Sequence, residues 1–179
     1  MIDPASGPFL FDTSAEGWLG RSERSEVRDW MLRYLSHHEI HTSAVTVVER
    51  VRGYSLLWRR TQEGGRERIE AARVAYLAAL GRVWPINGAV AVVSGEIMAM
   101  LPDPPTPPRR SHLMAESRQE RLARWRFDGM IAATALVARM PLIHNNAGDF
   151  EPIRSAIECS PERFPNLGPL ELIRCALLA

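Results

Sequence analysis

Four carboxylates stand inside or beside apolar stretches of the sequence. They are Asp12 after the run FLF, Glu49 within SAVTVVERVRGY, Asp128 before the stretch GMIAATALV, and Asp149 just before Phe150. A buried carboxylate is costly unless it is paired, protonated or bound to a cation. Four together would repel one another, and Mg²⁺ or Mn²⁺ would relieve that repulsion by binding their oxygen atoms. The set therefore predicts a divalent metal site that transfers a phosphoryl group to water.

Each of these acids also has a simpler interpretation. Asp12 and Asp128 both stand where a helix is expected to begin, so either could serve only as an N-terminal cap. Asp149 could be a turn residue. Glu49 lies within a predicted helix, where it could face solvent or pair with an arginine. Taken singly, the residues leave these alternatives open.

The elements that must position the acids are short apolar strands alternating with helices. Helical spacing of apolar residues predicts helices over 22–35, 44–60, 66–80 and 89–100, a helix that begins at Asp128, and a short tail helix over 170–178. Gly64 and Gly65 are expected to break the chain between the second and third helices. Strands are predicted at 8–11, 39–43, 83–86, 140–143 and 156–159, with Pro85 placing the third at an edge or an end of the sheet.

This alternation predicts an α/β fold with a mostly parallel sheet. Functional groups in such sheets gather at the carboxyl ends of the strands. Asp12 ends the first strand and Asp149 lies a few residues beyond Ile143. We therefore expect both acids at the same edge of the sheet.

The composition is that of a globular protein with a sizeable core. With 46% hydrophobic residues among 179, the chain is expected to form a single domain over 1–179. A formal net charge of +1 gives no strong nucleic-acid signal, although all 22 basic residues are arginine. The two cysteines, Cys159 and Cys175, do not form a disulfide framework. With neither a signal sequence nor a membrane span in the pattern, we expect a cytoplasmic protein without membrane association.

A proline- and arginine-rich excursion is expected at about 101–124. Five prolines in LPDPPTPPRR exclude a helix or a central strand there. The following polar segment is expected to be a helix or an arm. The excursion could contact an RNA backbone, form a dimer arm, or be a solvated hairpin. The candidate RNA-binding residues are Arg109, Arg110, Arg118, Arg121 and Arg124.

Two other features compete for a functional role. In HHEIH, an extended chain would place His37, Glu39 and His41 on one side, but the sequence supplies no further ligands at a zinc spacing. The five tryptophans are expected in the core or at an interface, and only Trp125, between two arginines, is a candidate for stacking on a base.

Four segments, taken together and in order, resemble the motifs of PIN-domain nucleases. FLFDTSAEGWL resembles the opening strand that ends in Asp-Thr/Ser, and SAVTVVERVRGY is similar to a motif with Ser, Thr, Glu and Gly at set spacing. DGMIAATAL resembles the third motif, and PLIHNNAGDF resembles the fourth, with His144 where the family often has threonine. The motifs span about residues 8–153, and the pattern is most similar to VapC-type toxin ribonucleases of toxin–antitoxin pairs.

The resemblance implies a three-layer α/β/α fold and an endoribonuclease that depends on Mg²⁺ or Mn²⁺. It also implies an antitoxin as partner and a homodimer. Two alternatives stay open, namely a non-cleaving module of the same fold that binds RNA or protein, and a metal-dependent DNA nuclease or phosphatase. The implied metal-binding and catalytic residues are Asp12, Glu49, Asp128 and Asp149, with polar support from Thr13, Ser14 and Asn146.

Overall fold

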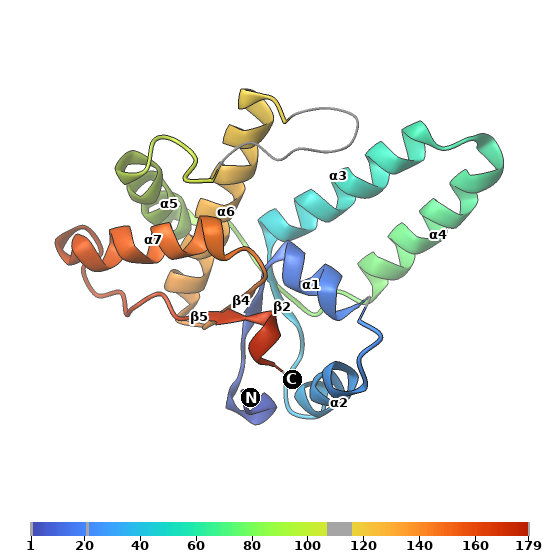
Figure 1. Cartoon of the computed structure of the whole chain (residues 1–179), viewed down its shortest axis with the longest axis horizontal. Helices are drawn as coiled ribbons and strands as arrows, with labels where there is room; N and C mark the ends of the chain where they lie inside the picture. Colours follow the sequence, from blue (N-terminus) through green and yellow to red (C-terminus); the bar gives the residue numbers. More distant parts are fainter. Residues whose placement is uncertain (1, 21, 107–115, 179) are drawn as a thin grey trace.

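A computed structural model describes residues 2–20, 22–106 and 116–178 of the chain (Figure 1). Strands and helices alternate along most of it, as the sequence pattern predicts. The strands are β1 (Leu10–Phe11), β2 (His41–Ser43), β3 (Arg82–Trp84), β4 (Leu142–His144) and β5 (Leu172–Arg174). The helices are α1 (Thr13–Leu19), α2 (Ser25–Leu35), α3 (Ala44–Arg60), α4 (Glu63–Ala78), α5 (Gly88–Met100), α6 (Arg118–Ala138) and α7 (Ala147–Cys159), with single 3₁₀ turns at Pro4–Ser6, Pro161–Arg163 and Cys175–Leu177.

The five strands form one sheet in the order β3-β2-β1-β4-β5, and all four neighbouring pairs are parallel. Strand β1 lies at the centre, where Phe11 is in register with Thr42 of β2 and with Ile143 of β4. The chain first builds the sheet outward from β1 on one side and then crosses to β4 on the other side. The carboxyl ends of β1 and β4 therefore flank the point where the strand order reverses, which is the usual position of a functional crevice.

Helices cover both faces of the sheet, which confirms the α/β/α architecture (Figure 1). On one face, Leu10 and Leu142 pack with α5, α6 and α7 into the larger apolar core. On the other face, Phe11 and Ile143 pack with Trp30 and other side chains of α1 and α2 into a smaller core. Successive strand residues point to opposite faces, so a two-residue strand such as β1 contributes to both cores.

The last predicted strand and the tail helix are wrong. Residues 156–159 belong to α7, because Ile153 and Ile157 are four residues apart and both buried, which is helical spacing. The last strand is instead β5, which pairs with β4 at the edge of the sheet. The tail then continues through a 3₁₀ turn, and Cys175 and Leu178 are fully buried in the smaller core.

Two helix boundaries also differ from the prediction. Gly64 and Gly65 lie in the first turn of α4, and the chain breaks earlier, at Thr61, whose backbone is extended. Helix α6 begins at Arg118, so Asp128 lies in its middle. Its start is fixed by a capping box in which Ser117 and Glu120 exchange hydrogen bonds. The segment 118–124, expected in the excursion, is thus part of a helix.

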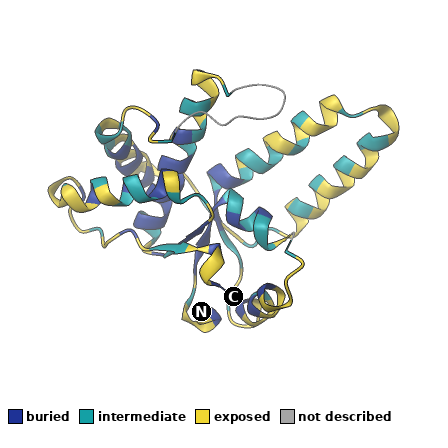
Figure 2. Ribbon diagram, in the orientation of Figure 1, coloured by how far each residue is buried: buried dark blue, intermediate teal, exposed yellow. Residues whose placement is uncertain are grey.

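Helices α3 and α4 form a hairpin that projects away from the sheet (Figures 1 and 2). No residue of α4 is buried. By contrast, α6 has nine buried residues and runs through the larger core. None of the helices in the described ranges is long and apolar enough to span a bilayer.

Candidate active site

Asp12 follows β1 directly and caps the N-terminus of α1. Its Oδ1 accepts a hydrogen bond from the backbone N–H of Ala15 at 2.6 Å, and the Ser14 hydroxyl donates to both carboxylate oxygens at 2.9 and 2.8 Å. The structure therefore confirms that Asp12 caps the N-terminus of α1. Burial nevertheless raises the pKa of Asp12 to about 7, against the lowering effect of these donors. The nearby carboxylates of Glu49 and Glu16 raise this pKa further.

Asp128 is buried on α6, and the expectation that it begins a helix is wrong. It lies ten residues after the first residue of α6, so it is not a cap. Burial raises its pKa well above the ordinary value, and the charges of Asp149, Glu49 and Asp12 add to this effect. The four acids predicted from the sequence therefore lie close enough to act on one another electrostatically.

Glu49 lies near the start of α3 and is half-buried. Thr13, the first residue of α1, donates a hydrogen bond from its hydroxyl to Glu49 Oε2. This contact ties α1 to α3 and orients the carboxylate. The solvent-facing alternative for Glu49 is wrong.

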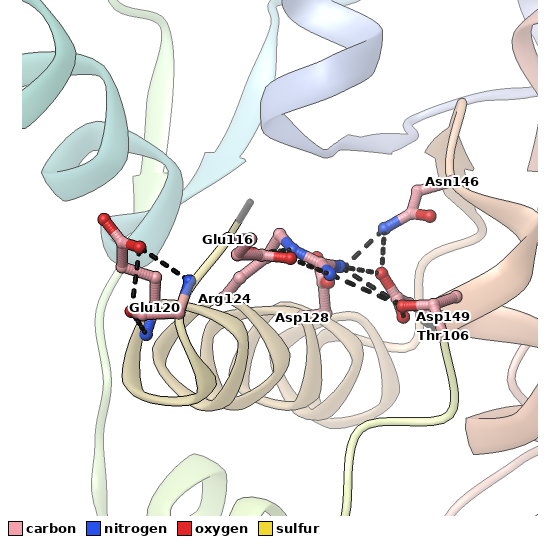
Figure 3. A network of polar contacts seen from close by, with 8 residues as sticks. Thr106, Glu116, Glu120, Arg124, Asp128, Asn146 and Asp149 are labelled. Atoms are coloured by element: carbon pink, nitrogen blue, oxygen red, sulfur yellow. Dashed lines mark hydrogen bonds and ion pairs between the residues drawn. The ribbon is translucent and has the colours of Figure 1, made fainter. Parts of the chain in front are cut away.

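Asp149 is fully buried in the first turn of α7. The side-chain amide of Asn146 donates to Asp149 Oδ2 at 2.6 Å and to Asp128 Oδ2 at 3.3 Å (Figure 3). Asn146 thus joins an acid of α6 to an acid of α7. Asp149 also accepts hydrogen bonds from Thr106 and Arg124, which lie outside the predicted motifs.

Two further contacts order the chain after β4. The Ser14 hydroxyl accepts a hydrogen bond from the backbone N–H of Asn145 at 3.1 Å, which links the ends of β1 and β4. His144 Nδ1 accepts from the backbone N–H of Asn146 at 3.2 Å. His144 is fully buried, and burial lowers its pKa to about 4. The neutral imidazole thus supports Asn146 at the position where the resemblance expects threonine.

The donor set fits a divalent cation held by few protein ligands. Asp12 and Asp128 are buried acids whose pKa values are raised chiefly by burial, so their charged forms lack compensation from the protein. Within the described residues, however, no group of three or more His, Cys, Asp or Glu side chains is gathered closely enough to hold an ion. Mg²⁺ commonly takes one or two carboxylates and completes its shell with water and phosphate oxygens.

The PIN domain family model matches residues 9–154 of the chain. This chain belongs to the PIN domain family. The match spans all four acids and all strands except β5. Among curated proteins, none matches the sequence.

Several solved structures share this fold. VapBC2 from Rickettsia felis, bound to a promoter DNA fragment, matches with a TM-score of 0.58 at 15% identity, over 93% of this chain and 97% of that one. FitAcB from Neisseria gonorrhoeae matches with a TM-score of 0.58 at 19% identity, over 94% and 99%. VapBC-1 from nontypeable Haemophilus influenzae matches with a TM-score of 0.57 at 16% identity, over 94% and 98%. At these identities the likeness extends to the fold alone.

The arginines of the PIN domain's predicted excursion do not share one environment. Arg109 and Arg110 lie outside the described residues. Arg118 is exposed at the start of α6 and Arg121 is half-buried. Arg124 instead turns its guanidinium to the acids (Figure 3). Of the candidates for RNA contact that are described, Arg118 is therefore the most accessible.

The two competing features of the sequence do not form sites in this PIN domain. Trp125 is 1% exposed, and its indole N–H donates to the backbone oxygen of Leu101 at 3.0 Å, so it cannot stack on a base. In HHEIH, His41 Nδ1 accepts from the indole of Trp84 at 3.1 Å, and His41 is not part of any metal-binding group in the described chain.

Three residues that lie beside the acids were not identified from the sequence. Glu16 lies near Asp12 and pairs with Arg50 at 3.1 Å, and its position four residues after Asp12 was a local signal for this. Arg124 lies four residues before Asp128, which places both on one face of α6 once the helix is extended back to its capping box. Thr106 carried no signal, because it reaches Asp149 across 43 positions of the chain.

Proposed function

We propose that this protein is an endoribonuclease that depends on Mg²⁺ or Mn²⁺ and acts as the toxin of a toxin–antitoxin pair. The observation that carries the proposal is that Asp149, Glu49 and Asp12, which come from separate elements, all act electrostatically on Asp128. Asp12 and Asp128 are both buried, their pKa values are raised, and they lie near the switch point of a parallel sheet. Buried carboxylates with perturbed pKa values at such a crevice are the expected signature of a reacting site.

Each acid has a role in the proposed hydrolysis. Asp12, Asp128 and Asp149 would bind the metal, and Asn146 would hold Asp128 and Asp149 in place. Glu49, held by Thr13, would orient the attacking water and accept its proton. A bound divalent cation activates water and stabilises charge on the phosphate oxygens. The water oxygen bonds to phosphorus, the bond to the leaving ribose oxygen breaks, and that oxygen takes up a proton.

The polar residues would hold these acids in place. Ser14 bonds both oxygens of Asp12 and also the backbone after β4, so it fixes β1 against β4. Asn146 spans Asp128 and Asp149. Support of this kind keeps carboxylates of the same charge at close range without rearrangement during the reaction.

The choice of an active enzyme over a non-cleaving module rests on the acids. A binding module of this fold would not require all four carboxylates to be present, and here their charges act on one another. The choice of RNA over DNA or a small phosphoester rests on the resemblance to VapC-type toxins. Metal chemistry of this kind is common to nucleases and phosphatases, so substrate comparison must separate them.

The toxin assignment rests on the motifs that resemble those of VapC-type toxins and is supported by the solved VapBC and FitAcB structures that share the fold. An antitoxin partner and a homodimer both need accessible apolar surface. The described chain has such surface on α3, α4 and α5. Its large exposed apolar side chains there include Val48, Leu57, Trp58, Val74, Leu77 and Val92. Co-purification with the product of a neighbouring gene, and light scattering of the purified protein, test these two expectations.

The decisive experiment is a cleavage assay on structured RNA with Mg²⁺ or Mn²⁺, with a chelator, and with single-stranded DNA and a small phosphoester as competing substrates. We expect metal-dependent RNA cleavage that Asp12→Ala and Asp128→Ala each lower by about a hundredfold or more, because each carboxylate would help to hold the metal that stabilises the transition state. The matched control is Asp29→Ala, which removes an exposed carboxylate on α2. Full activity of either active-site variant would exclude the assigned site.

A further inference from the structure

Arg124 places a positive charge among the acids that are proposed to bind the metal. It lies on α6 one turn before Asp128, and its side chain is only 13% exposed. Its Nη1 donates to Asp149 Oδ2, while Nε and Nη2 donate to the two oxygens of Glu116 at 3.0 and 3.2 Å (Figure 3). A guanidinium can bridge two carboxylates in this way because its donors form a rigid planar fork.

The other oxygen of Asp149 is taken by the Pro-rich segment. Thr106 donates its hydroxyl to Asp149 Oδ1 at 2.6 Å and accepts weaker contacts from Arg124 at 3.4 and 3.5 Å. The fit is close, since a Cβ on Gly148 would lie 2.8 Å from Thr106 Cγ2. With Asn146 also donating to Oδ2, both oxygens of Asp149 have hydrogen-bond donors.

We propose that Arg124 is an internal cation of the acid cluster and that a divalent metal must compete with it for Asp149. The inference rests on the proposed function, because that function requires the metal. Thr106 contacts both Asp149 and Arg124, and Glu116 binds the other side of the Arg124 guanidinium. These two residues therefore support the pair of Arg124 and Asp149. In the metal-free protein, Arg124 thus offsets the charge of Asp149.

Glu116 explains how a metal could replace Arg124 at Asp149 without leaving the arginine unpaired. A buried arginine that loses every carboxylate partner is strongly destabilised, which would oppose metal binding altogether. Here Arg124 has two carboxylate partners, Asp149 on α7 and Glu116 just before α6, and Glu116 accepts from both Nε and Nη2. When a metal neutralises Asp149, the guanidinium keeps its contacts to Glu116 and gives up only those of Nη1.

The proposal makes metal affinity the quantity to measure. Protein stripped of metal is titrated with Mn²⁺ in a calorimeter as wild type, Arg124→Gln, Arg124→Lys and Thr106→Val. Circular dichroism checks that each variant folds. The matched control is Arg163→Gln, which removes the ion pair to Glu96 and touches none of the four acids.

We expect Arg124→Gln to bind Mn²⁺ at least about fivefold more tightly, the low end of coupling between linked ligands. Arg124→Lys keeps the charge and should stay within about twofold of wild type, which separates charge competition from the loss of a structural contact. Thr106→Val should tighten binding by about twofold and provides the same test if Arg124→Gln does not fold. Arg163→Gln should match wild type.

Two negative results have different meanings. If wild type, Arg124→Gln and Thr106→Val bind Mn²⁺ with equal affinity, or the variants bind more weakly, the competition is wrong and the proposed function stands. If none of the proteins binds Mn²⁺ or Mg²⁺, both the competition and the metal-dependent function are overturned.

Discussion

Asp12 combines a structural role with a proposed chemical one. As the cap of α1, it receives hydrogen bonds from the backbone of Ala15 and the hydroxyl of Ser14. Donors to a carboxylate normally lower its pKa, yet burial outweighs them and leaves the pKa at about 7. Metal-free protein therefore carries Asp12 partly protonated near neutral pH, and the capping interaction alone does not balance its charge.

This raised pKa predicts that the difference in stability between wild type and Asp12→Asn depends on pH. A carboxyl whose pKa rises from 3.8 to about 7 on folding binds its proton more tightly in the native state. Stability from this group is therefore lost as the pH rises through that window. In the presence of chelator, the free energy of unfolding of Asp12→Asn minus that of wild type should increase by on the order of 2–3 kcal/mol between pH 5 and pH 8.

Urea denaturation at several pH values measures this difference. Using the difference between the two proteins cancels the titration of other groups, such as buried His144. The surface variant Asp29→Asn controls for the chemical change itself. If the difference in unfolding free energy does not increase with pH, the pKa of Asp12 is not raised by burial.

The start of α7 and the Pro-rich segment fit together at the level of elements. Gly148 lies in the first turn of α7, where Thr106 approaches so closely that a side chain would not fit. Thr106 is β-branched, so turning it away from a new methyl group also moves its hydroxyl away from Asp149. This glycine is therefore expected to protect the contact that holds the segment against the site.

A pair of glycine variants tests this fit. Gly148→Ala should destabilise the protein by about 1 kcal/mol, because the steric conflict exceeds the gain in helix propensity. The matched control is Gly95→Ala in α5, where nothing lies within 4 Å of the new Cβ. That change should stabilise the protein by about 0.5–1 kcal/mol. Thermal denaturation of both proteins measures the effects, and equal shifts would exclude the close packing of Thr106.

At the scale of the whole molecule, stability is distributed unevenly between the sheet and the α3–α4 hairpin. The two cores on either side of the sheet hold most of the buried apolar side chains. The outer hairpin is mostly exposed or half-buried (Figure 2). Elements with few buried contacts open at low free energy, whereas those in the core open only when the whole domain unfolds.

Hydrogen exchange should therefore separate α4 from α6. We expect the amides of α4, which has no buried residue, to exchange much faster than those in the buried second half of α6. Mass spectrometry of peptides from each helix measures this in metal-free protein. Equal protection of both helices would contradict this expectation and would indicate that α4 is covered in solution.

Local patterns were enough to predict the elements whose neighbours in sequence decide their structure. The first four strands were predicted at nearly their observed positions. Strands β1, β3 and β4 contain apolar residues, and β1, β2 and β3 are each followed by a side chain that caps the next helix. Strand β5 was missed, since three residues at a sheet edge become a strand only by pairing with β4, some 30 positions earlier. The start of α6 had a local signal in Ser117 and Glu120, which was overlooked.

The sequence by itself determined the α/β alternation and identified four acids and their supporting polar residues as candidates for a site. It could do so because strand ends, helix caps and motif spacing are local properties of the chain. Only the tertiary structure decided that Asp128 lies inside a helix where three other acids raise its pKa, and that Arg124 pairs with both Glu116 and Asp149. Such contacts depend on how a loop and three helices pack at one sheet edge, and no local pattern encodes that packing.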